Sequence, residues 1–260
     1  KTTTLAHGIS SEFGTLGIRI SSHSFASQLV TAFNGGITAT SANASWQKKP
    51  YTIDDILKPL SEKQKQKLTL IINAGELPKR PASTVIDTTM ADSMVLRKGD
   101  LLIEANTTEF TSHSVDDTKQ LLQRIMLKNW NALRKHGLLI ALVGDLGVGK
   151  TVCVQGIGTF LQIPGTITSP SYTLLHEYHY LRHGVSGMLY HADPWRLEQF
   201  ESFLQLGIEQ LLQPNNIVAV EWASKYLPQL EQLAKDHHSQ MIQISLVDLG
   251  NNDRKISFSD

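Results

Sequence analysis

The segment spanning residues 144–151 constrains the fold more than any other part of the chain. It fits the pattern G-x-x-x-x-G-K-[ST] at every fixed position and reads Gly144-Asp145-Leu146-Gly147-Val148-Gly149-Lys150-Thr151. It follows an uninterrupted apolar run at 138–143, typical of a buried parallel strand, and precedes a helical pattern at 151–160. Glycines in such a loop let successive backbone N–H groups point into one concavity and bind phosphate oxygens. We therefore predict that all eight residues bind a nucleotide, with Lys150 at the β- and γ-phosphates and Thr151 as a Mg²⁺ ligand.

Two further strand patterns end in a carboxylate. The run at 188–192 is followed by Asp193, and the run at 217–220 is followed by Glu221. P-loop enzymes use a carboxylate at the ligand-binding edge of a parallel sheet to hold the metal ion or its waters. We predict that Asp193 and Glu221 act as catalytic residues together with Lys150, and as metal ligands together with Thr151. For each acid taken alone, an exposed strand end without a function remains the alternative.

The order of these patterns predicts an α/β fold. A helix is expected from 115 to 135, with Ser114 as its N-cap and Gly137 at its end. After it, strand patterns at 138–143, 188–192 and 217–221 alternate with helical patterns at 151–160, 197–206 and 227–237. This alternation favours a mainly parallel sheet flanked by helices, the architecture of a P-loop NTPase domain.

The distribution of charge predicts two domains. Residues 1–100 carry twelve Lys and Arg against eight Asp and Glu, whereas residues 101–260 carry twelve against sixteen. We place the boundary after residue 104, giving units 1–104 and 105–260. The first unit is expected to be mixed α/β, with helices at 25–33 and 53–66 and strands at 16–20, 68–73 and 84–87. Because the whole chain is neutral, any contact with nucleic acid needs a local patch or a partner.

Composition excludes several other classes of protein. No stretch approaches the roughly 18 unbroken apolar residues of a membrane span. The single cysteine, Cys153, excludes an internal disulfide framework and favours the reducing cytoplasm, and it is expected to be a small buried hydrophobe. The histidines at 176, 179, 183 and 191 lack the His-Glu-x-x-His spacing, so we do not expect a zinc site.

Residues from about 107 to 245 resemble the TsaE family, small P-loop ATPases of bacterial tRNA threonylcarbamoyladenosine (t6A) synthesis. Besides the phosphate loop, the resemblance rests on Thr168-Ser169-Pro170-Ser171-Tyr172, His191-Ala192-Asp193-Pro194-Trp195-Arg196-Leu197 and Val220-Glu221-Trp222. It implies that 168–171 form a switch-like loop near the γ-phosphate, with Thr168 at the nucleotide. It also implies that Asp193 and Glu221 serve the magnesium and the water, and that Trp222 lies beside the nucleotide. Pro194-Trp195 replaces the usual Leu-Tyr of the family. Family members join a TsaB–TsaD complex and hydrolyse ATP to sustain its turnover, so the implied partners are TsaB and TsaD and, through them, tRNA.

The first hundred residues resemble the C-terminal half of the YrdC/TsaC family, the threonylcarbamoyl-AMP synthases of the same pathway. The matching segments are 17–23, Thr40-Ser41-Ala42-Asn43, Ser83-Thr84-Val85-Ile86-Asp87 and Leu96-Arg97-Lys98-Gly99. The resemblance implies ATP, L-threonine and bicarbonate as substrates. Ser41 and Asn43 offer short neutral hydrogen-bonding groups and Arg97 a planar fork for phosphate, so these three residues and Ser83 are the predicted nucleotide contacts. Each of them, taken alone, fits a turn residue or a surface arginine better than a nucleotide contact, and only their joint order favours the nucleotide site.

The N-terminal half of the YrdC/TsaC family, with its basic Lys-x-Arg motif, has no counterpart ahead of Lys1. Either a further segment supplies that half, or the half that is present is a non-catalytic remnant. A half-sheet would leave a long unpaired edge, which favours the first alternative.

Three hypotheses follow for the function. The first is an enzyme of t6A synthesis that hydrolyses ATP in its second unit. The second is a nucleotide-dependent binding or scaffold module that turns over slowly. The third is an unrelated P-loop kinase, which is the least favoured because a kinase lid needs several arginines and residues 160–215 contain only Arg182 and Arg196.

Overall fold

The computed structural model forms two compact units, Lys1–Ala82 and Ser83–Asp260, and each unit is described by itself. The described residues are 6, 8–12, 14–43, 48–89, 93–97, 99 and 109–259. The division by contacts places the segment that starts at Ser83 with the second unit. The boundary expected after residue 104 falls outside the described residues and stays a prediction.

The first unit contains three short helices. They are α1 (Ser24–Phe33), α2 (Ile53–Leu57) and α3 (Glu62–Lys65). Helix α1 confirms the helix predicted at 25–33. The single helix predicted at 53–66 is wrong, because Pro59 lacks a backbone N–H and separates two helices. Each of the two begins with its own capping box, at Thr52 and at Ser61.

The strands predicted at 16–20 and 68–73 are not strands in the structure. Ile18, Ile20 and Leu70 are 80%, 93% and 77% exposed, and no described residue of the first unit is buried. A strand is stabilised by ladder hydrogen bonds and by side-chain packing across the sheet. The described part of this unit provides neither of these for the two apolar segments.

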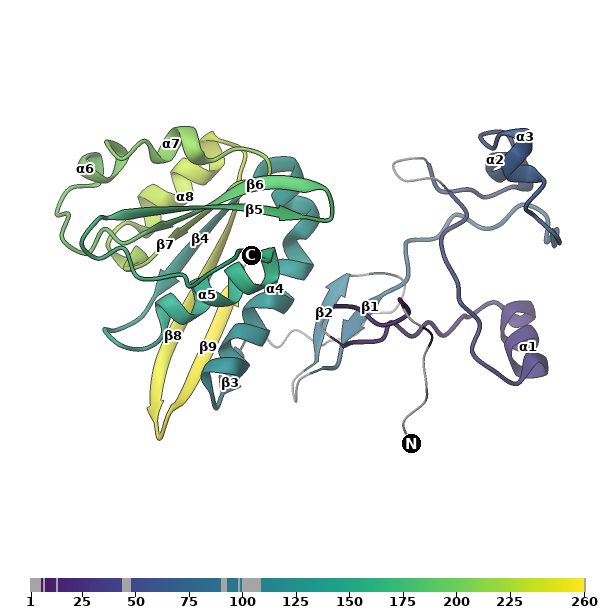
Figure 1. Cartoon of the computed structure of the whole chain (residues 1–260), viewed down its shortest axis with the longest axis horizontal. Helices are drawn as coiled ribbons and strands as arrows, with labels where there is room; N and C mark the ends of the chain where they lie inside the picture. Colours follow the sequence, from purple (N-terminus) through teal and green to yellow (C-terminus); the bar gives the residue numbers. More distant parts are fainter. Residues whose placement is uncertain are drawn as a thin grey trace. The chain divides into compact units, whose positions relative to one another are not determined.

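The second unit is built on a seven-stranded sheet with the strand order β3-β9-β8-β4-β7-β6-β5 (Figure 1). Its strands are β3 (Glu109–Ser112), β4 (Leu138–Val143), β5 (Leu175–Arg182), β6 (Val185–Ala192), β7 (Ile217–Val220), β8 (Gln240–Gly250) and β9 (Asp253–Ser259). The four central strands, β8, β4, β7 and β6, are parallel to their neighbours within this group. Antiparallel strands extend the sheet at both edges. This confirms the predicted α/β class.

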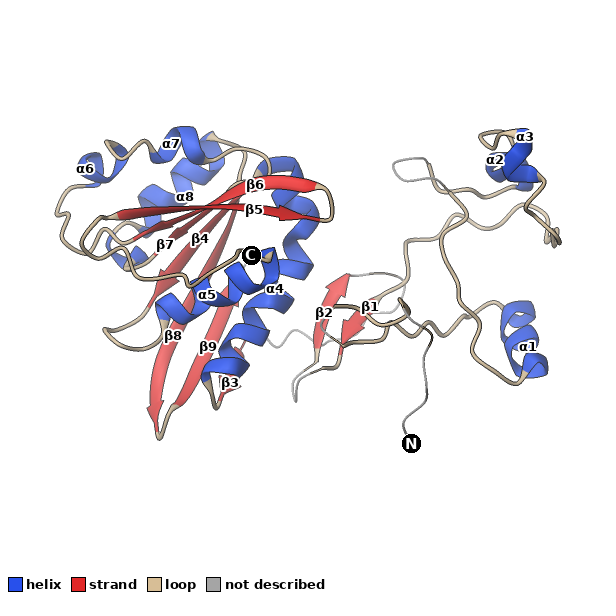
Figure 2. Ribbon diagram, in the orientation of Figure 1, coloured by secondary structure: helices blue, strands red, loops and turns tan. Residues whose placement is uncertain are grey.

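Helices cover both faces of this sheet (Figure 2). They are α4 (Val115–His136), α5 (Lys150–Leu161), α6 (Phe200–Leu204), α7 (Ile208–Leu211), the 3₁₀ helix η1 (Ala223–Lys225) and α8 (Leu227–Asp236). Successive residues of β4 point to opposite faces, so Ile140 and Leu142 join one core and Leu139 and Ala141 join the other. Because both faces are covered, β4 is an uninterrupted apolar run, as the sequence predicts.

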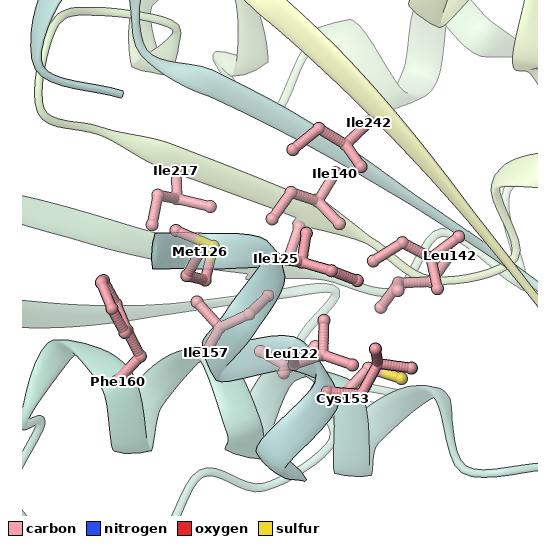
Figure 3. Close-up of a cluster of buried hydrophobic side chains, with 14 of the residues drawn as sticks. Leu122, Ile125, Met126, Ile140, Leu142, Cys153, Ile157, Phe160, Ile217 and Ile242 are labelled. Atoms are coloured by element: carbon pink, nitrogen blue, oxygen red, sulfur yellow. The ribbon is translucent and has the colours of Figure 1, made fainter. Parts of the chain in front are cut away.

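The first of these cores lies between the sheet and the helices α4 and α5. Figure 3 shows side chains of the sheet facing side chains of both helices. From the sheet come Ile140, Leu142, Ile217 and Ile242; from α4, Leu122, Ile125 and Met126; and from α5, Cys153, Ile157 and Phe160. Cys153 is fully buried, which confirms its predicted role as a small hydrophobe, and burial raises its pKa to about 12.

Helix α4 fixes the position of α5 against the sheet. It begins at Ser114, whose hydroxyl accepts a hydrogen bond from the Asp117 backbone, and ends at Gly137, as predicted. A Cβ atom built on Gly156 of α5 would lie 2.9 Å from the Leu122 Cβ and 2.9 Å from the Lys119 Cα. Only glycine therefore permits this close approach of the two helices.

A two-stranded ribbon, β1 (Val85–Asp87) and β2 (Met94–Arg97), also belongs to the second unit. Met94 is buried in the same core as α4, and the Arg124 Nε lies 2.9 Å from the Asp87 Oδ2. The strand predicted at 84–87 is thereby confirmed. Within the described parts of the chain, no helix combines the length and the apolar character needed to cross a bilayer.

Candidate nucleotide site

The phosphate loop lies between β4 and α5, in the context that its sequence predicts. Gly144, Gly147 and Gly149 have φ angles of 150°, 78° and 110°, values that residues with a side chain adopt with strain. A Cβ atom on Gly144 would also lie 2.7 Å from the Leu246 carbonyl oxygen. The glycines are thus required by the shape of the loop, which opens directly onto the N-terminus of α5, where anionic phosphates bind favourably.

Lys150, the first residue of α5, turns back over the loop. Its Nζ donates to the carbonyl oxygens of Gly144 and Asp145 at 3.0 Å and 2.8 Å. It also lies 3.9 Å from the centre of the Trp222 ring. Burial lowers the pKa of Lys150, while the negative charges of Glu221 and Asp193 act in the opposite direction. The amino group therefore sits at the mouth of the loop, within reach of a group bound there.

The two predicted acids meet at the carboxyl ends of neighbouring parallel strands. Ala192 of β6 and Val220 of β7 are partners in the sheet, and Asp193 and Glu221 are the residues that follow them. The Glu221 backbone N–H donates to the Ala192 carbonyl oxygen at 2.8 Å. Both carboxylates are buried, so the alternative of exposed strand ends is wrong.

Glu221 joins the sheet to the phosphate loop. The Thr151 hydroxyl donates to Glu221 Oε1 at 2.7 Å. The same oxygen lies 2.8 Å from Nε2 of His191, a fully buried side chain of β6 whose Nδ1 has no hydrogen-bond partner in the structure. Because an ionised carboxylate only accepts hydrogen bonds, Nε2 is the donor in this contact. His191 thus orients the Glu221 carboxylate, a role that sequence reasoning missed.

Asp193 contacts the segment 168–171, which the resemblance to the TsaE family implies is a switch-like loop. Its Oδ2 accepts hydrogen bonds from the Ser171 hydroxyl at 2.6 Å and the Ser169 hydroxyl at 3.4 Å. The Thr168 backbone N–H donates to the Tyr178 hydroxyl at 3.3 Å, and the Thr168 side chain is exposed. The predicted contact of Thr168 with a nucleotide stays a prediction.

Several cation–aromatic contacts involve residues next to those of the site. Trp222, with φ of 55°, turns the chain sharply after Glu221 and places its ring over Lys150. The Arg196 guanidinium lies 4.9 Å and 5.2 Å from the ring centres of Tyr172 and Trp195. Arg254 of β9 donates to the Val148 carbonyl oxygen of the loop, a contact for which the sequence offers no signal.

The residues present fit a Mg²⁺ ion that is carried by the nucleotide. The Thr151 hydroxyl and the carboxylates of Asp193 and Glu221 are hard oxygen donors of the kind that Mg²⁺ prefers. Among the described residues, no group of three or more His, Cys, Asp or Glu side chains could hold a metal ion by itself. Mg²⁺ usually binds through one or two carboxylates, waters and substrate phosphates, which matches this donor set.

A second set of nucleotide contacts was predicted from the resemblance to the YrdC/TsaC family. Its four residues are divided between the two units. Ser41 and Asn43 lie in the loop after α1 of the first unit. In the second unit, the Arg97 Nε donates to the Ser83 carbonyl oxygen at 3.0 Å, so β2 and the start of β1 bring these two residues together. That all four residues contact one nucleotide stays a prediction.

Comparison with protein families supports both resemblances. The family model described as threonylcarbamoyl adenosine biosynthesis protein TsaE matches residues 112–256. The YrdC family model, described as telomere recombination, matches residues 1–99. The crystal structure of Bacillus subtilis YdiB is 24% identical and covers 58% of this chain and 82% of its own, with a TM-score of 0.39.

Curated relatives agree with the family model. The TsaE protein of Treponema pallidum is 32% identical over 125 residues, which are 48% of this chain and 84% of the relative. The TsaE protein of Bacillus subtilis is 33% identical over 128 residues, which are 49% of this chain and 73% of the relative. The TsaE protein of a Synechocystis strain is 47% identical over 98 residues, 36% of this chain and 59% of the relative. Residues 1–99 precede this region and match the YrdC family model. Because the TsaE model matches more than half of the chain, the chain belongs to the TsaE family of threonylcarbamoyl adenosine biosynthesis proteins.

Proposed function

We propose that the second unit binds Mg²⁺-ATP in the phosphate loop and hydrolyses it during the synthesis of tRNA threonylcarbamoyladenosine. The observation that carries the proposal is the hydrogen bond between Thr151 and Glu221, which brings the loop hydroxyl and a strand-end carboxylate to one point. Family membership supports the pathway and argues against an unrelated kinase.

The phosphate loop and Lys150 would bind the triphosphate. Backbone N–H groups of the loop would face the phosphates, as in other loops of this kind. The Lys150 amino group donates to the carbonyl oxygens of Gly144 and Asp145. When a nucleotide binds, charged phosphate oxygens would replace these carbonyl oxygens as its acceptors. Because Lys150 is buried, its attraction for the charge that develops during hydrolysis is screened little by water.

The metal ion would be held by Thr151, Glu221 and Asp193, directly or through its waters. When bound, Mg²⁺ neutralises negative charge on the phosphate oxygens. The Thr151 hydroxyl donates its proton to Glu221, so its lone pairs remain available to a cation. His191 keeps the Glu221 carboxylate in place.

Asp193 would connect hydrolysis to the segment 168–171. Ser169 and Ser171 both point at its Oδ2. If Asp193 turns toward the metal ion or the attacking water, these serines lose their acceptor, and the segment with Thr168 is released toward the γ-phosphate. The nucleotide state would thereby change the exposed surface around Tyr172, which is 86% exposed.

The partners of this unit are proposed to be a TsaB–TsaD pair, with tRNA reached through them, and the proposed location is the cytoplasm. The excess of acidic residues in 101–260 argues against direct binding of a polyanion by this unit. A single cysteine, held as a buried thiol, fits a reducing compartment.

The first unit is proposed to contribute to threonylcarbamoyl-AMP synthesis from ATP, L-threonine and bicarbonate. Support comes from the match of residues 1–99 to the YrdC family model. Ile18, Ile20 and Leu70 are largely exposed, and such apolar side chains are expected to be covered in an active synthase. A further segment with the basic half of the nucleotide site would provide that cover.

Steady-state release of phosphate, with and without a purified TsaB–TsaD pair, tests the function of the second unit. We expect Mg²⁺-dependent hydrolysis of ATP that the pair alters and that Lys150→Ala lowers at least about 10²-fold. Nucleotide binding without any hydrolysis, alone or with the pair, would instead identify a nucleotide-dependent binding module.

A further inference from the structure

Arg254 connects the C-terminal hairpin to the phosphate loop. It is the second residue of β9 and lies opposite Asp248 of β8 and Ser112 of β3. Its Nε donates to the Val148 carbonyl oxygen at 2.8 Å, and its Nη1 donates to the Asn252 carbonyl oxygen at 3.0 Å. One guanidinium therefore bridges the phosphate loop and the turn of the hairpin.

The hydrogen bond from Arg254 supplies a donor to a carbonyl oxygen of the phosphate loop. A loop that directs its N–H groups toward phosphates turns carbonyl oxygens outward, and these require other donors. The Val148 side chain is buried, and its carbonyl oxygen receives a charged donor from Arg254. Charge-assisted hydrogen bonds are stronger than neutral ones, so this contact restrains the loop at the residue before Gly149.

Arg254 also packs against the backbone of Gly149. A Cβ atom on Gly149 would lie 3.3 Å from the Arg254 Nε, which is tighter than an ordinary contact. The guanidinium thus lies directly behind the glycine from which α5 starts.

We propose that Arg254 is a positioning residue of the nucleotide site: it holds Val148 and Gly149 in the phosphate-binding conformation, so that the β8–β9 hairpin sets the affinity for nucleotide phosphates. The inference rests on the proposed function of the loop. Arg254 contacts the outer side of the loop and acts on the phosphates through it. Its loss should therefore weaken binding of ATP and ADP alike and leave the chemical step nearly unchanged.

Calorimetric titration with ATP and ADP, together with steady-state hydrolysis, tests this inference on the full chain. Arg254→Ala should raise both dissociation constants and the KM about tenfold, the effect of one charge-assisted hydrogen bond, with kcat within about twofold of the parent. Arg254→Lys keeps the charge but lacks the fork that reaches Val148 and Asn252 together, so it should recover only part of the affinity. The matched control is Lys255→Ala, which removes a charge from the next residue of β9, where Lys255 Nζ lies 2.8 Å from Glu109 Oε2. This control should bind nucleotide as the parent does.

Parental affinity in Arg254→Ala, or an equal loss in Lys255→Ala, would overturn the inference. Full recovery by Arg254→Lys would also overturn it, because charge alone would then suffice. If Arg254→Ala does not fold, as judged by its thermal transition, Arg254→Gln is measured with the same expectation. If the parent chain does not bind ATP at all, the proposed function is refuted. If the parent and Arg254→Ala bind ATP equally well, only the role of Arg254 is refuted.

Discussion

The variant Glu221→Gln tests the centre of the nucleotide site, because one carboxylate oxygen there serves two side chains. Glu221 Oε1 accepts from the Thr151 hydroxyl at 2.7 Å and lies 2.8 Å from His191 Nε2. Glutamine preserves the shape of the side chain and one acceptor oxygen but removes the negative charge. The variant therefore separates the charge of Glu221 from its packing.

The expected magnitude follows from these two contacts. A hydrogen bond to a charged group contributes about 1.5–3 kcal/mol and a neutral one about 0.5–1.5 kcal/mol, so each contact loses about 1 kcal/mol. Two contacts give about 2 kcal/mol, which corresponds to roughly 30-fold in rate if the lost orientation is felt in the transition state. Loss of the charge that would face the metal ion adds to this effect. We expect kcat to fall at least about 30-fold while KM changes much less.

The assay is phosphate release at saturating ATP and Mg²⁺, with the affinity for ADP measured by calorimetry in the presence and absence of Mg²⁺. Glu177→Gln is the matched control, since Glu177 is an exposed carboxylate on β5 and should leave hydrolysis unchanged. A kcat for Glu221→Gln within about threefold of the parent would refute the reasoning, because neither the charge nor the orientation of Thr151 would then matter to the reaction.

Three more predictions test the loop, the packing and the first unit. Lys150→Ala should cut phosphate release at least about 10²-fold by removing a cation from the developing charge, and an unchanged rate would contradict the assignment of the loop. Gly156→Ala should lower the free energy of unfolding, measured in urea, by about 1–2 kcal/mol. The new Cβ would clash with Leu122, and the cost of this clash should exceed the gain in helix propensity. An unchanged urea midpoint would mean that α5 shifts freely. Arg97→Ala, in the chain supplied with an N-terminal half of the YrdC family, should impair threonine-dependent release of pyrophosphate and spare phosphate release by the second unit. Equal losses in both would show that the two sites are coupled.

The second unit shows which parts of the site a sequence can predict. The phosphate loop, Asp193 and Glu221 were predictable because each follows a local rule: glycines before a helix, or an acid after an apolar strand. Their meeting follows from topology, because β6 and β7 are parallel and Ala192 pairs with Val220. A local pattern and a simple rule for parallel strands were therefore enough to assemble the centre of the site.

His191 and Arg254 were not predictable, for a different physical reason. His191 lies on an ordinary strand, and its role depends on the register that places Glu221 beside it. Arg254 lies 106 residues from Val148 in the chain and reaches it only because β9 folds back antiparallel to β8. Neither contact leaves a periodicity or a spacing in the sequence, since each depends on a pairing between distant segments.

The failed strand predictions in the first unit have the same origin. The runs at 16–20 and 138–143 are both apolar enough to read as strands. The second becomes β4 because β7 and β8 pair with both of its edges and helices cover both of its faces. The first run finds no such partner among the described residues of its unit, and Ile18 and Ile20 remain exposed. An apolar pattern therefore specifies a capacity to form a strand, and neighbouring segments decide whether that strand forms. By this reasoning, the run at 16–20 should become a strand only when a segment that pairs with it is present.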